Sequence, residues 1–277
     1  MDHAEKLSAH YAHGGLLTAI RAGLEAQGIA PENASVEDLA PVDEFHIGGR
    51  TATAHLLGQL AIKRSDVILD IGCGLGGAAR FVAKTYGARV VGLDLTAEYI
   101  ETGQVLCDWV GLSERIELVH GSALSVPFEA GHFDGAYMMH VGMNIDDKRS
   151  LFAEISRVLK PGAKFGIYDI MQTNDDDLAY PVPWATTSET SWLARPDAYR
   201  TALESCGFSE VRENNRHAFA MEFFKKMKAA NAGRDAPPPL GLHVLMQQSA
   251  PEKIANMVAN LAADRIAPVE MLAVKEG

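Results

Sequence analysis

Cysteine and basic residues are both scarce in this sequence. Its 277 residues include 3 cysteines, Cys73, Cys107 and Cys206, whose spacing indicates neither a disulfide framework nor a CxxC metal site. Lysine and arginine number 25 against 36 aspartates and glutamates, which gives a formal net charge of −11. Surfaces that bind nucleic acid or anionic membranes need the opposite balance, and no apolar run reaches the roughly 18 residues of a membrane-spanning helix. We therefore expect neither a nucleic-acid partner nor a membrane partner.

The first residues lack the features of a targeting or metal-binding segment. Residues 1–6 have neither the charged region nor the apolar region of a signal peptide, so we expect a cytoplasmic protein. His3, His10 and His13 have no carboxylate partners at metal-ligand spacing, and a solvated helix face explains them better than a metal site. We expect no bound metal.

The rest of the composition is that of an ordinary globular protein, with 47% hydrophobic and 22% charged residues. Between residues 66 and 170, short β-rich apolar runs alternate with helical periodicity, as a doubly wound, Rossmann-like, mostly parallel sheet requires. We therefore predict an α/β fold. The expected strands are 67–70, 89–95, 116–120, 133–138 and 164–170. The expected helices are 77–86, 97–110 and 148–159, the last ended by Lys160-Pro161-Gly162.

A glycine loop follows the first expected strand, which ends at Asp70. Glycines at Gly72-x-Gly74-x-x-Gly77 let a ligand approach the backbone and admit φ > 0 in a tight strand-to-helix turn, which indicates a nucleotide-like cofactor. The spacing also satisfies the dinucleotide fingerprint, and Asp94 is far enough downstream to hold a ribose in either case. Asp70 favours one of the two, because its carboxylate would repel a pyrophosphate and suits the ammonium and sulfonium of S-adenosylmethionine.

Further elements follow this core. A helix over 196–206, a turn at 207–208 and a strand beginning at 210–212 come next, and the last apolar run, 269–275, predicts a final strand. A long segment with helical patterns separates these two strands. We interpret 219–266 as a helical insertion, which either covers the cofactor end of the sheet or forms an oligomer contact such as that of a homodimer.

The segment before the first strand is largely helical in pattern. Leu16, Leu17, Ile20 and Leu24 recur at the spacing of one helix face, so this segment can pack over the carboxyl ends of the strands. We therefore divide the chain into an N-terminal helical lid, 1–60, and a cofactor-binding domain, 61–277, which contains the insertion.

Several motifs follow one another in order between residues 43 and 170. They are Asp70-Ile71-Gly72-Cys73-Gly74, Gly92-Leu93-Asp94-Leu95, Gly121-Ser122-Ala123, Leu124-Ser125-Val126-Pro127-Phe128 and Arg157-Val158-Leu159-Lys160-Pro161-Gly162. Together they resemble the successive motifs of class I S-adenosylmethionine-dependent methyltransferases. The segments 43–49, 140–148 and 180–185 are similar to a small-molecule branch that includes sarcosine/dimethylglycine and phosphoethanolamine methyltransferases. The resemblance implies a seven-stranded sheet with an antiparallel last strand.

The resemblance also implies the cofactor contacts, with S-adenosyl-L-homocysteine as the product. Gly72 and Gly74 would line the methionine end, Asp94 would take both ribose hydroxyls and Leu95 would pack on the adenine. The family usually has an acidic residue at position 122, where this chain has a serine, so the Ser122 hydroxyl or the Ala123 backbone would make a weaker contact to the adenine edge. The further residues that we assign to the cofactor site are Asp70, Cys73, Met139, His46 and Ile47.

Two of these residues have competing interpretations. Cys73 lies at a helix N-terminus, where a thiol pKa can fall, so it is either a nucleophile or, more simply, a small side chain that fills the turn. His46, with Ile47, precedes Gly48-Gly49 and either reaches the cofactor carboxylate or the acceptor, or belongs to a structural turn.

The candidate catalytic residues are His140, Asn144 and Tyr11. Methyl transfer from a sulfonium has a good leaving group, so the enzyme must mainly align the acceptor and exclude water. His140 follows the fourth strand at its carboxyl end, where ligands bind in open α/β sheets, and it can serve as a base near neutral pH. Asn144, near a position where the phosphoethanolamine enzymes carry histidine, can orient an acceptor but cannot take a proton.

Two aromatic residues are expected at the acceptor. Tyr11 resembles the lid tyrosine of the phosphoethanolamine enzymes and would contact the substrate or the methyl group. Trp184, after the fifth strand, would form an aromatic wall for an alkylammonium or aromatic acceptor, unless it simply packs in the core.

These residues predict a methyltransferase that moves a methyl group from S-adenosyl-L-methionine to a small-molecule methyl acceptor. N-methylation of an amine or amino acid is favoured, with O-methylation next, and the acidic balance favours neutral or cationic acceptors. Two alternatives stay open. One is an NAD-dependent oxidoreductase, which Asp70 argues against. The other is a module that binds S-adenosylmethionine without turnover.

Overall fold

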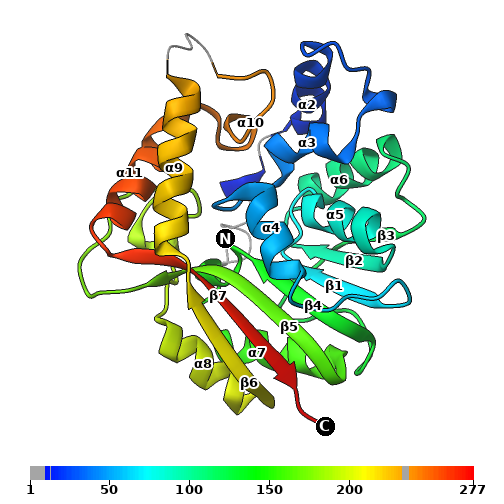
Figure 1. Cartoon of the computed structure of the whole chain (residues 1–277), viewed down its shortest axis with the longest axis vertical. Helices are drawn as coiled ribbons and strands as arrows, with labels where there is room; N and C mark the ends of the chain where they lie inside the picture. The colour runs from blue at the N-terminus through cyan, green and yellow to red at the C-terminus, as the bar shows by residue number, and fades with distance from the viewer. Residues whose placement is uncertain (1–9, 13, 233–236) are drawn as a thin grey trace.

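The alternating apolar runs form a seven-stranded sheet in the order β3-β2-β1-β4-β5-β7-β6 (Figure 1). The computed structural model describes residues 10–12, 14–232 and 237–277. The strands are β1 (Val67–Ile71), β2 (Arg89–Asp94), β3 (Ile116–His120), β4 (Phe133–Met139), β5 (Leu159–Gln172), β6 (Phe208–Asn215) and β7 (Ile266–Lys275). The pairs among β1 to β5 are parallel, whereas β7 pairs antiparallel with both β5 and β6. The predicted α/β class and the antiparallel last strand are thus confirmed.

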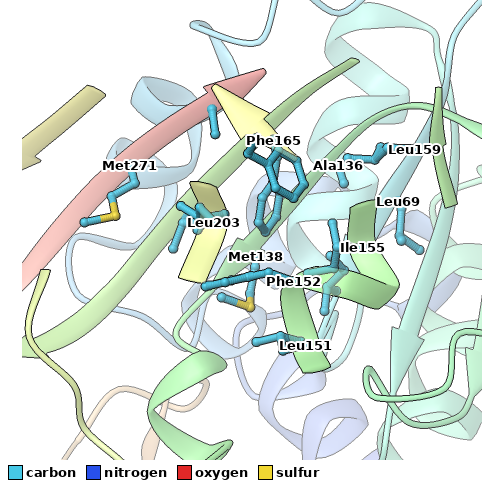
Figure 2. Close-up of a cluster of buried hydrophobic side chains, with 14 of the residues drawn as sticks. Leu69, Ala136, Met138, Leu151, Phe152, Ile155, Leu159, Phe165, Leu203 and Met271 are labelled. Carbon is cyan, nitrogen blue, oxygen red and sulfur yellow. The ribbon is translucent and has the colours of Figure 1, made fainter. Parts of the chain in front are cut away.

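Helices cover both faces of the sheet. On one face lie α4 (Gly49–Leu57), α5 (Gly77–Tyr86) and α6 (Ala97–Trp109), and on the other lie α7 (Lys148–Val158) and α8 (Pro196–Ser205). Figure 2 shows the second interface, where Leu151, Phe152 and Ile155 of α7 pack against β-strand residues such as Phe165. These side chains are fully buried, and each contributes about 1.5–3 kcal/mol through the hydrophobic effect. The sheet is therefore a stable platform for whatever binds at its edge.

The remaining helices stand above the carboxyl ends of the parallel strands, in two groups (Figure 1). The first group comprises α2 (Leu16–Glu25), η1 (Pro31–Asn33) and α3 (Val36–Asp43). The second comprises α9 (His217–Asn231), α10 (His243–Met246), η4 (Gln247–Ser249) and α11 (Ala250–Ala262), all between β6 and β7. Two short 3-10 turns, η2 (Gly142–Asn144) and η3 (Ser188–Thr190), follow β4 and β5. Among the described residues, no helix is long and apolar enough to cross a membrane.

The two groups of helices touch each other. Leu16, Ile20 and Leu24 of α2 belong to one buried cluster with Leu240 and Leu245, and α10 contacts both α2 and α3. This contact joins the predicted lid to the predicted insertion, and we call the joined helices the roof. The domain boundary at residue 60 stays a prediction, since α4 lies within 1–60 but packs against β5 and α5.

Several element ends differ from the sequence prediction. Strand β5 begins at Leu159 instead of Lys164, because Leu159 pairs with Phe133 before a register shift leads to the pair of Lys164 with Gly135. Gly162, with φ 78°, lies in the irregular stretch that this shift creates. Strand β6 begins at Phe208, two residues early, because that side chain is buried in the core. Helix α7 does end at Val158, just before the expected stop signal.

Candidate active site

A cavity of about 430 Å³ lies at the carboxyl ends of β1, β2 and β4. Nearly all the predicted site residues line it: Tyr11, His46, Asp70, Gly72, Cys73, Gly74, Asp94, Leu95, Ser122, Ala123, Met139, His140, Asn144 and Trp184. We call the lining residues of the segments 70–99 and 121–124 the cofactor half. Those of the segments 140–147 and 183–192, with Tyr11, Leu245 and Met257, form the acceptor half.

Ile47 is the exception among the predicted site residues. Its side chain is buried in a cluster with Met143 and Ile170 and is absent from the described lining of the cavity. Its carbonyl oxygen accepts a hydrogen bond of 3.0 Å from the Tyr168 hydroxyl. The structure therefore gives Ile47 a packing contact and does not bring it to the cofactor half.

The glycine loop is shaped by contacts that no other residue type permits. Gly72 has φ 66° and donates its N–H to the Leu93 carbonyl at 2.7 Å. A Cβ atom at Gly72 would lie 2.3 Å from Val141 Cγ2, so only glycine fits between β1 and the segment after β4. Gly74, with φ 55°, donates its N–H to Asp94 Oδ2 at 2.8 Å. The loop is therefore hydrogen-bonded to the end of β2 and packed closely against the segment after β4.

Two buried carboxylates mark the cofactor half. Asp70 Oδ2 is buried and has no hydrogen-bond partner among the described residues. Burial raises the pKa of Asp70 to about 8, while the neighbouring Tyr137 hydroxyl acts in the opposite direction. Asp94 accepts N–H groups from Gly74 and Thr96, each at 2.8 Å, and burial raises its pKa as well. A bound cation would favour the ionised form of Asp70, whereas Asp94 is already oriented by the backbone.

Cys73 fills the turn. Its side chain is buried, and burial raises the pKa of the thiol well above its usual range. A Cβ atom at Gly92 would lie 2.8 Å from the Cys73 sulfur, which shows how closely the side chain packs against β2. A protonated, enclosed thiol does not support the nucleophile interpretation.

His140 begins the acceptor half with a strained backbone. Its φ is 57°, a value unusual for a residue other than glycine, and its N–H donates to the Tyr168 carbonyl at 2.7 Å. The imidazole stacks on the Tyr168 ring at 5.2 Å between centroids. Its Nε2 atom is buried without a hydrogen-bond partner among the described residues. Burial lowers the pKa of His140 well below its usual value, so the imidazole is neutral near pH 7.

His46 lies beside His140, with 5.9 Å between the ring centroids. Its Nε2 atom is 2.9 Å from Thr53 Oγ1 and 3.2 Å from the Gly49 carbonyl oxygen. Because Thr53 donates its own proton to Glu44, both of these oxygens act as acceptors, and Nε2 must carry the imidazole proton. Burial lowers the pKa of His46 to about 4, so Nδ1 is unprotonated near neutral pH.

Glu44 is the buried end of this chain of hydrogen bonds. Burial and the neighbouring Asp43 raise its pKa to about 7, although Arg50 Nε lies 2.9 Å from Glu44 Oε1 and lowers it. The sequence analysis missed Glu44 and Thr53. The available signals for Glu44 were its position two residues before His46 and its place in the segment 43–49 that carries the family resemblance.

Tyr11 and Asn144 meet across the cavity. The Asn144 side chain hydrogen-bonds to the Tyr11 hydroxyl, and burial raises the pKa of Tyr11. The Tyr11 ring also lies edge-on to Phe45, at 6.4 Å between centroids. Trp184 is buried and donates its indole N–H to Ser191 Oγ at 2.9 Å, so it both packs in the core and lines the cavity.

Other lining residues were missed by the sequence analysis. They include Phe45, Tyr99, Met143, Trp192, Leu245 and Met257. Leu245 and Met257 come from the insertion, where nothing but helical periodicity marked them. Of the three N-terminal histidines considered for a metal, His3 and His13 lie outside the described residues, and His10 Nε2 lies 3.1 Å from the Pro183 carbonyl. The described part of the chain contains no cluster of three or more His, Cys, Asp or Glu side chains able to hold a metal.

Comparisons with known proteins agree with this arrangement. Residues 69–167 match the family model described as a methyltransferase domain. A sterol 24-C-methyltransferase from Gibberella zeae is 34% identical over 127 residues, which are 45% of this chain and 33% of that protein. The matched segment thus spans only about a third of the length of that curated relative.

Solved structures with the same fold cover nearly the whole chain. A putative sarcosine dimethylglycine methyltransferase from Galdieria sulphuraria has a TM-score of 0.69 at 19% identity and covers 94% of this chain and 98% of its own. Haemonchus contortus phosphoethanolamine N-methyltransferase 2, in complex with phosphomonomethylethanolamine and S-adenosylhomocysteine, has a TM-score of 0.68 at 19% identity. It covers 93% of this chain and 60% of its own. Residues 69–167 therefore match a methyltransferase domain, and the chain has the same fold as these two methyltransferase structures.

Proposed function

We propose that this chain transfers a methyl group from S-adenosylmethionine to a small acceptor. One observation carries the proposal: Asp70 and His140 line one cavity, and each has a buried polar atom, Oδ2 and Nε2 respectively, without a hydrogen-bond partner among the described residues. Buried polar atoms are nearly always hydrogen-bonded in folded proteins, so such atoms in a cavity are typical of ligand contacts. The first suits a cationic cofactor, and the second suits a proton-bearing acceptor.

The cofactor half has the groups that S-adenosylmethionine requires. Asp70 would hold the ammonium, the backbone at Gly72 and Gly74 would line the methionine end, and Asp94 retains free lone pairs for the ribose hydroxyls. Leu95 would pack on the adenine, with Ser122 and Ala123 at its edge. When bound, the cofactor supplies an electrophilic methyl group, whose carbon–sulfur bond breaks as the acceptor's lone pair forms the new bond.

The acceptor half supports proton acceptance by His140. A neutral imidazole can take a proton at Nε2, whereas an imidazolium cannot, and the burial of His140 keeps it neutral. The same burial makes His140 a weaker base than a free imidazole, so its main contribution is to accept a hydrogen bond from the acceptor. The backbone strain at His140 is of the kind found at functional sites. Tyr11 and Asn144, joined by their hydrogen bond, would position the acceptor and keep water out of the cavity.

The acceptors of the compared proteins differ in charge. Phosphoethanolamine and sarcosine carry a phosphate and a carboxylate, whereas a sterol carries neither. Among the acceptors expected from the sequence, an amine or a hydroxyl compound suits the acceptor half better than an amino acid, because the described lining contains no lysine or arginine to hold a carboxylate. The dinucleotide alternative gains no support from the methyltransferase match over residues 69–167.

Isothermal titration calorimetry with S-adenosylmethionine tests the cofactor half directly. We expect binding by the wild-type protein and at least about a hundredfold weaker binding by Asp94→Ala, because the buried ribose hydroxyls would lose their acceptors. His140→Ala should bind the cofactor normally and fail to form S-adenosylhomocysteine with a panel of amines, phenols, thiols and carboxylates. Unchanged affinity in Asp94→Ala, or tight competition by NAD, would contradict the proposal.

A further inference from the structure

Among the described residues, the charged side chains that line the cavity are all acidic. Five aspartates line it, at positions 43, 70, 94, 146 and 147, and no lysine or arginine of the described chain does. Asp43 forms a buried ion pair, because Arg80 donates to its Oδ2 atom at 2.6 Å. Asp146 and Asp147 belong to the acceptor half but are exposed, and Asp147 accepts the N–H and hydroxyl of Ser150. Solvent therefore screens both carboxylates, and they attract a cationic acceptor only weakly.

The two buried lysines nearest to the acceptor half are held by other groups. Lys148 donates its ammonium to the carbonyl oxygens of Ile145 and Trp192, the latter at 2.8 Å. Lys253 has its Nζ atom 3.5 Å from His10 Nε2, and burial lowers its pKa. Neither ammonium is among the groups that line the cavity. An anionic group on the acceptor would therefore lose its hydration without gaining a cation from the described residues, which is costly.

The rest of the acceptor half is apolar. Its walls are formed by Met143, Ile145, Trp184, Trp192, Leu245 and Met257. These side chains come from four separate segments, so the apolar surface surrounds the acceptor position on several sides. Besides the exposed carboxylates of Asp146 and Asp147 and the two indole N–H groups, its described polar side chains are His140 and the Tyr11–Asn144 pair. Such a lining recognises an apolar body and orients it through one or two polar contacts.

We propose that the acceptor is an uncharged molecule with an apolar, ring-sized body and one hydroxyl group that donates to His140 Nε2. This inference rests on the proposed function and deepens it by naming the acceptor class. In the reaction, an oxygen lone pair forms the bond to the methyl carbon, and the electron pair of the carbon–sulfur bond stays on sulfur. The hydroxyl proton passes to His140 Nε2 and then to solvent. No oxidant, reductant or further reactant is needed.

Binding of matched phenols to the protein saturated with S-adenosylhomocysteine tests the charge preference. We would titrate p-ethylphenol, p-hydroxyphenylacetate and tyramine, which share the ring and hydroxyl and differ in the charge of the tail. Calorimetry and the fluorescence of Trp184 and Trp192 give two readouts that do not depend on turnover. We expect p-ethylphenol to bind at least about tenfold more tightly than p-hydroxyphenylacetate, and tyramine no more tightly than p-ethylphenol.

A variant that supplies the missing cation sharpens the test. Met257→Lys places an ammonium in the acceptor half, and we expect it to reverse the preference between p-ethylphenol and p-hydroxyphenylacetate by about tenfold or more. Ala259→Lys adds the same charge on the exposed face of α11 and should leave the preference unchanged. If thermal unfolding shows that Met257→Lys does not fold, Leu245→Lys makes the same substitution from α10.

The outcomes separate this inference from the proposed function. The inference is wrong if p-ethylphenol does not bind, if p-hydroxyphenylacetate or phosphoethanolamine binds at least as tightly, or if tyramine binds more tightly. It is also wrong if a folded Met257→Lys protein keeps the wild-type preference. In each of these cases the proposed function stands as long as S-adenosylmethionine binds and Asp94→Ala abolishes that binding. If the wild-type protein does not bind S-adenosylmethionine, both the proposed function and this inference are wrong.

Discussion

The two halves of the cavity are built in different ways. The cofactor half comes mainly from one continuous stretch, in which β1, the glycine loop and β2 are held together by backbone hydrogen bonds. The acceptor half is assembled from an N-terminal tyrosine, the segments after β4 and β5, and two helices of the insertion. A local, backbone-defined site tolerates little change, whereas a site of side chains from distant segments can change its ligand without changing the fold.

The largest loss of stability and of cofactor binding is expected from a substitution at Gly72, in the cofactor half. Gly72→Ala forces a Cβ atom to within 2.3 Å of Val141 Cγ2 at a φ of 66°, so we expect a loss of about 3 kcal/mol in unfolding free energy and no measurable cofactor binding. Gly131→Ala is the matched control, since its φ is also 66° but nothing lies within 4 Å of the added Cβ. It should lose only about 1 kcal/mol and bind normally. Equal effects of the two substitutions would contradict the close fit at Gly72.

The division between the two halves also separates most of what the sequence could predict from what it could not. The strands, the glycine loop, Asp70 and Asp94 could be predicted, because spacing along the chain determines where consecutive strand ends lie. His140 was predictable for the same reason, as the residue that follows β4. Leu245 and Met257 could not be, since their place in the cavity depends on how the insertion folds back over the sheet. Ile47 illustrates the converse: it adjoins His46 in sequence, but its side chain turns into the core.

The cofactor half should also respond to pH through Asp70. Its folded pKa of about 8 exceeds the usual value near 3.9, so the ligand-free folded state binds the extra proton and its stability falls as pH rises from about 4 to 8. A cationic cofactor requires the carboxylate, so its binding should release about one proton at pH 7 and strengthen by up to about tenfold per pH unit below pH 8.

Calorimetry in buffers of different ionisation enthalpy measures that proton. Asp70→Asn should release none and lose the pH dependence of affinity, whereas Asp177→Asn, in an exposed loop, should behave like the wild-type protein. Proton release that persists in Asp70→Asn would assign the titration to another group.

Smaller effects are expected in the acceptor half. Tyr11→Phe removes the hydroxyl that bonds to Asn144, and we expect kcat/KM to fall by about tenfold, equivalent to about 1.4 kcal/mol, with cofactor affinity unchanged. Tyr86→Phe, on α5 and outside the described cavity lining, should have no effect on either quantity. A parallel loss of cofactor affinity in Tyr11→Phe would show that the two halves are not separable.

The smallest effect on activity is expected from Glu44, which is linked to His46 through the Thr53 hydroxyl. Glu44→Gln removes the carboxylate that accepts the Thr53 proton, so the Nε2–H form of His46 is no longer the only one favoured. We expect kcat to fall by about threefold and the pH–rate profile to shift, with normal cofactor binding. Glu37→Gln, an exposed substitution on α3, is the control. An unaltered pH–rate profile would confine Glu44 to a packing role.

The contact between α2 and α10 bears on the order in which the molecule assembles. It joins an early helix to a late one, so closing it costs more loop entropy than pairing neighbouring strands does. Strands β1 to β5 can therefore pair before the roof closes, and the roof can open without separating these strands. We therefore expect the roof, rather than the sheet, to be the part that opens when the cavity is filled or emptied.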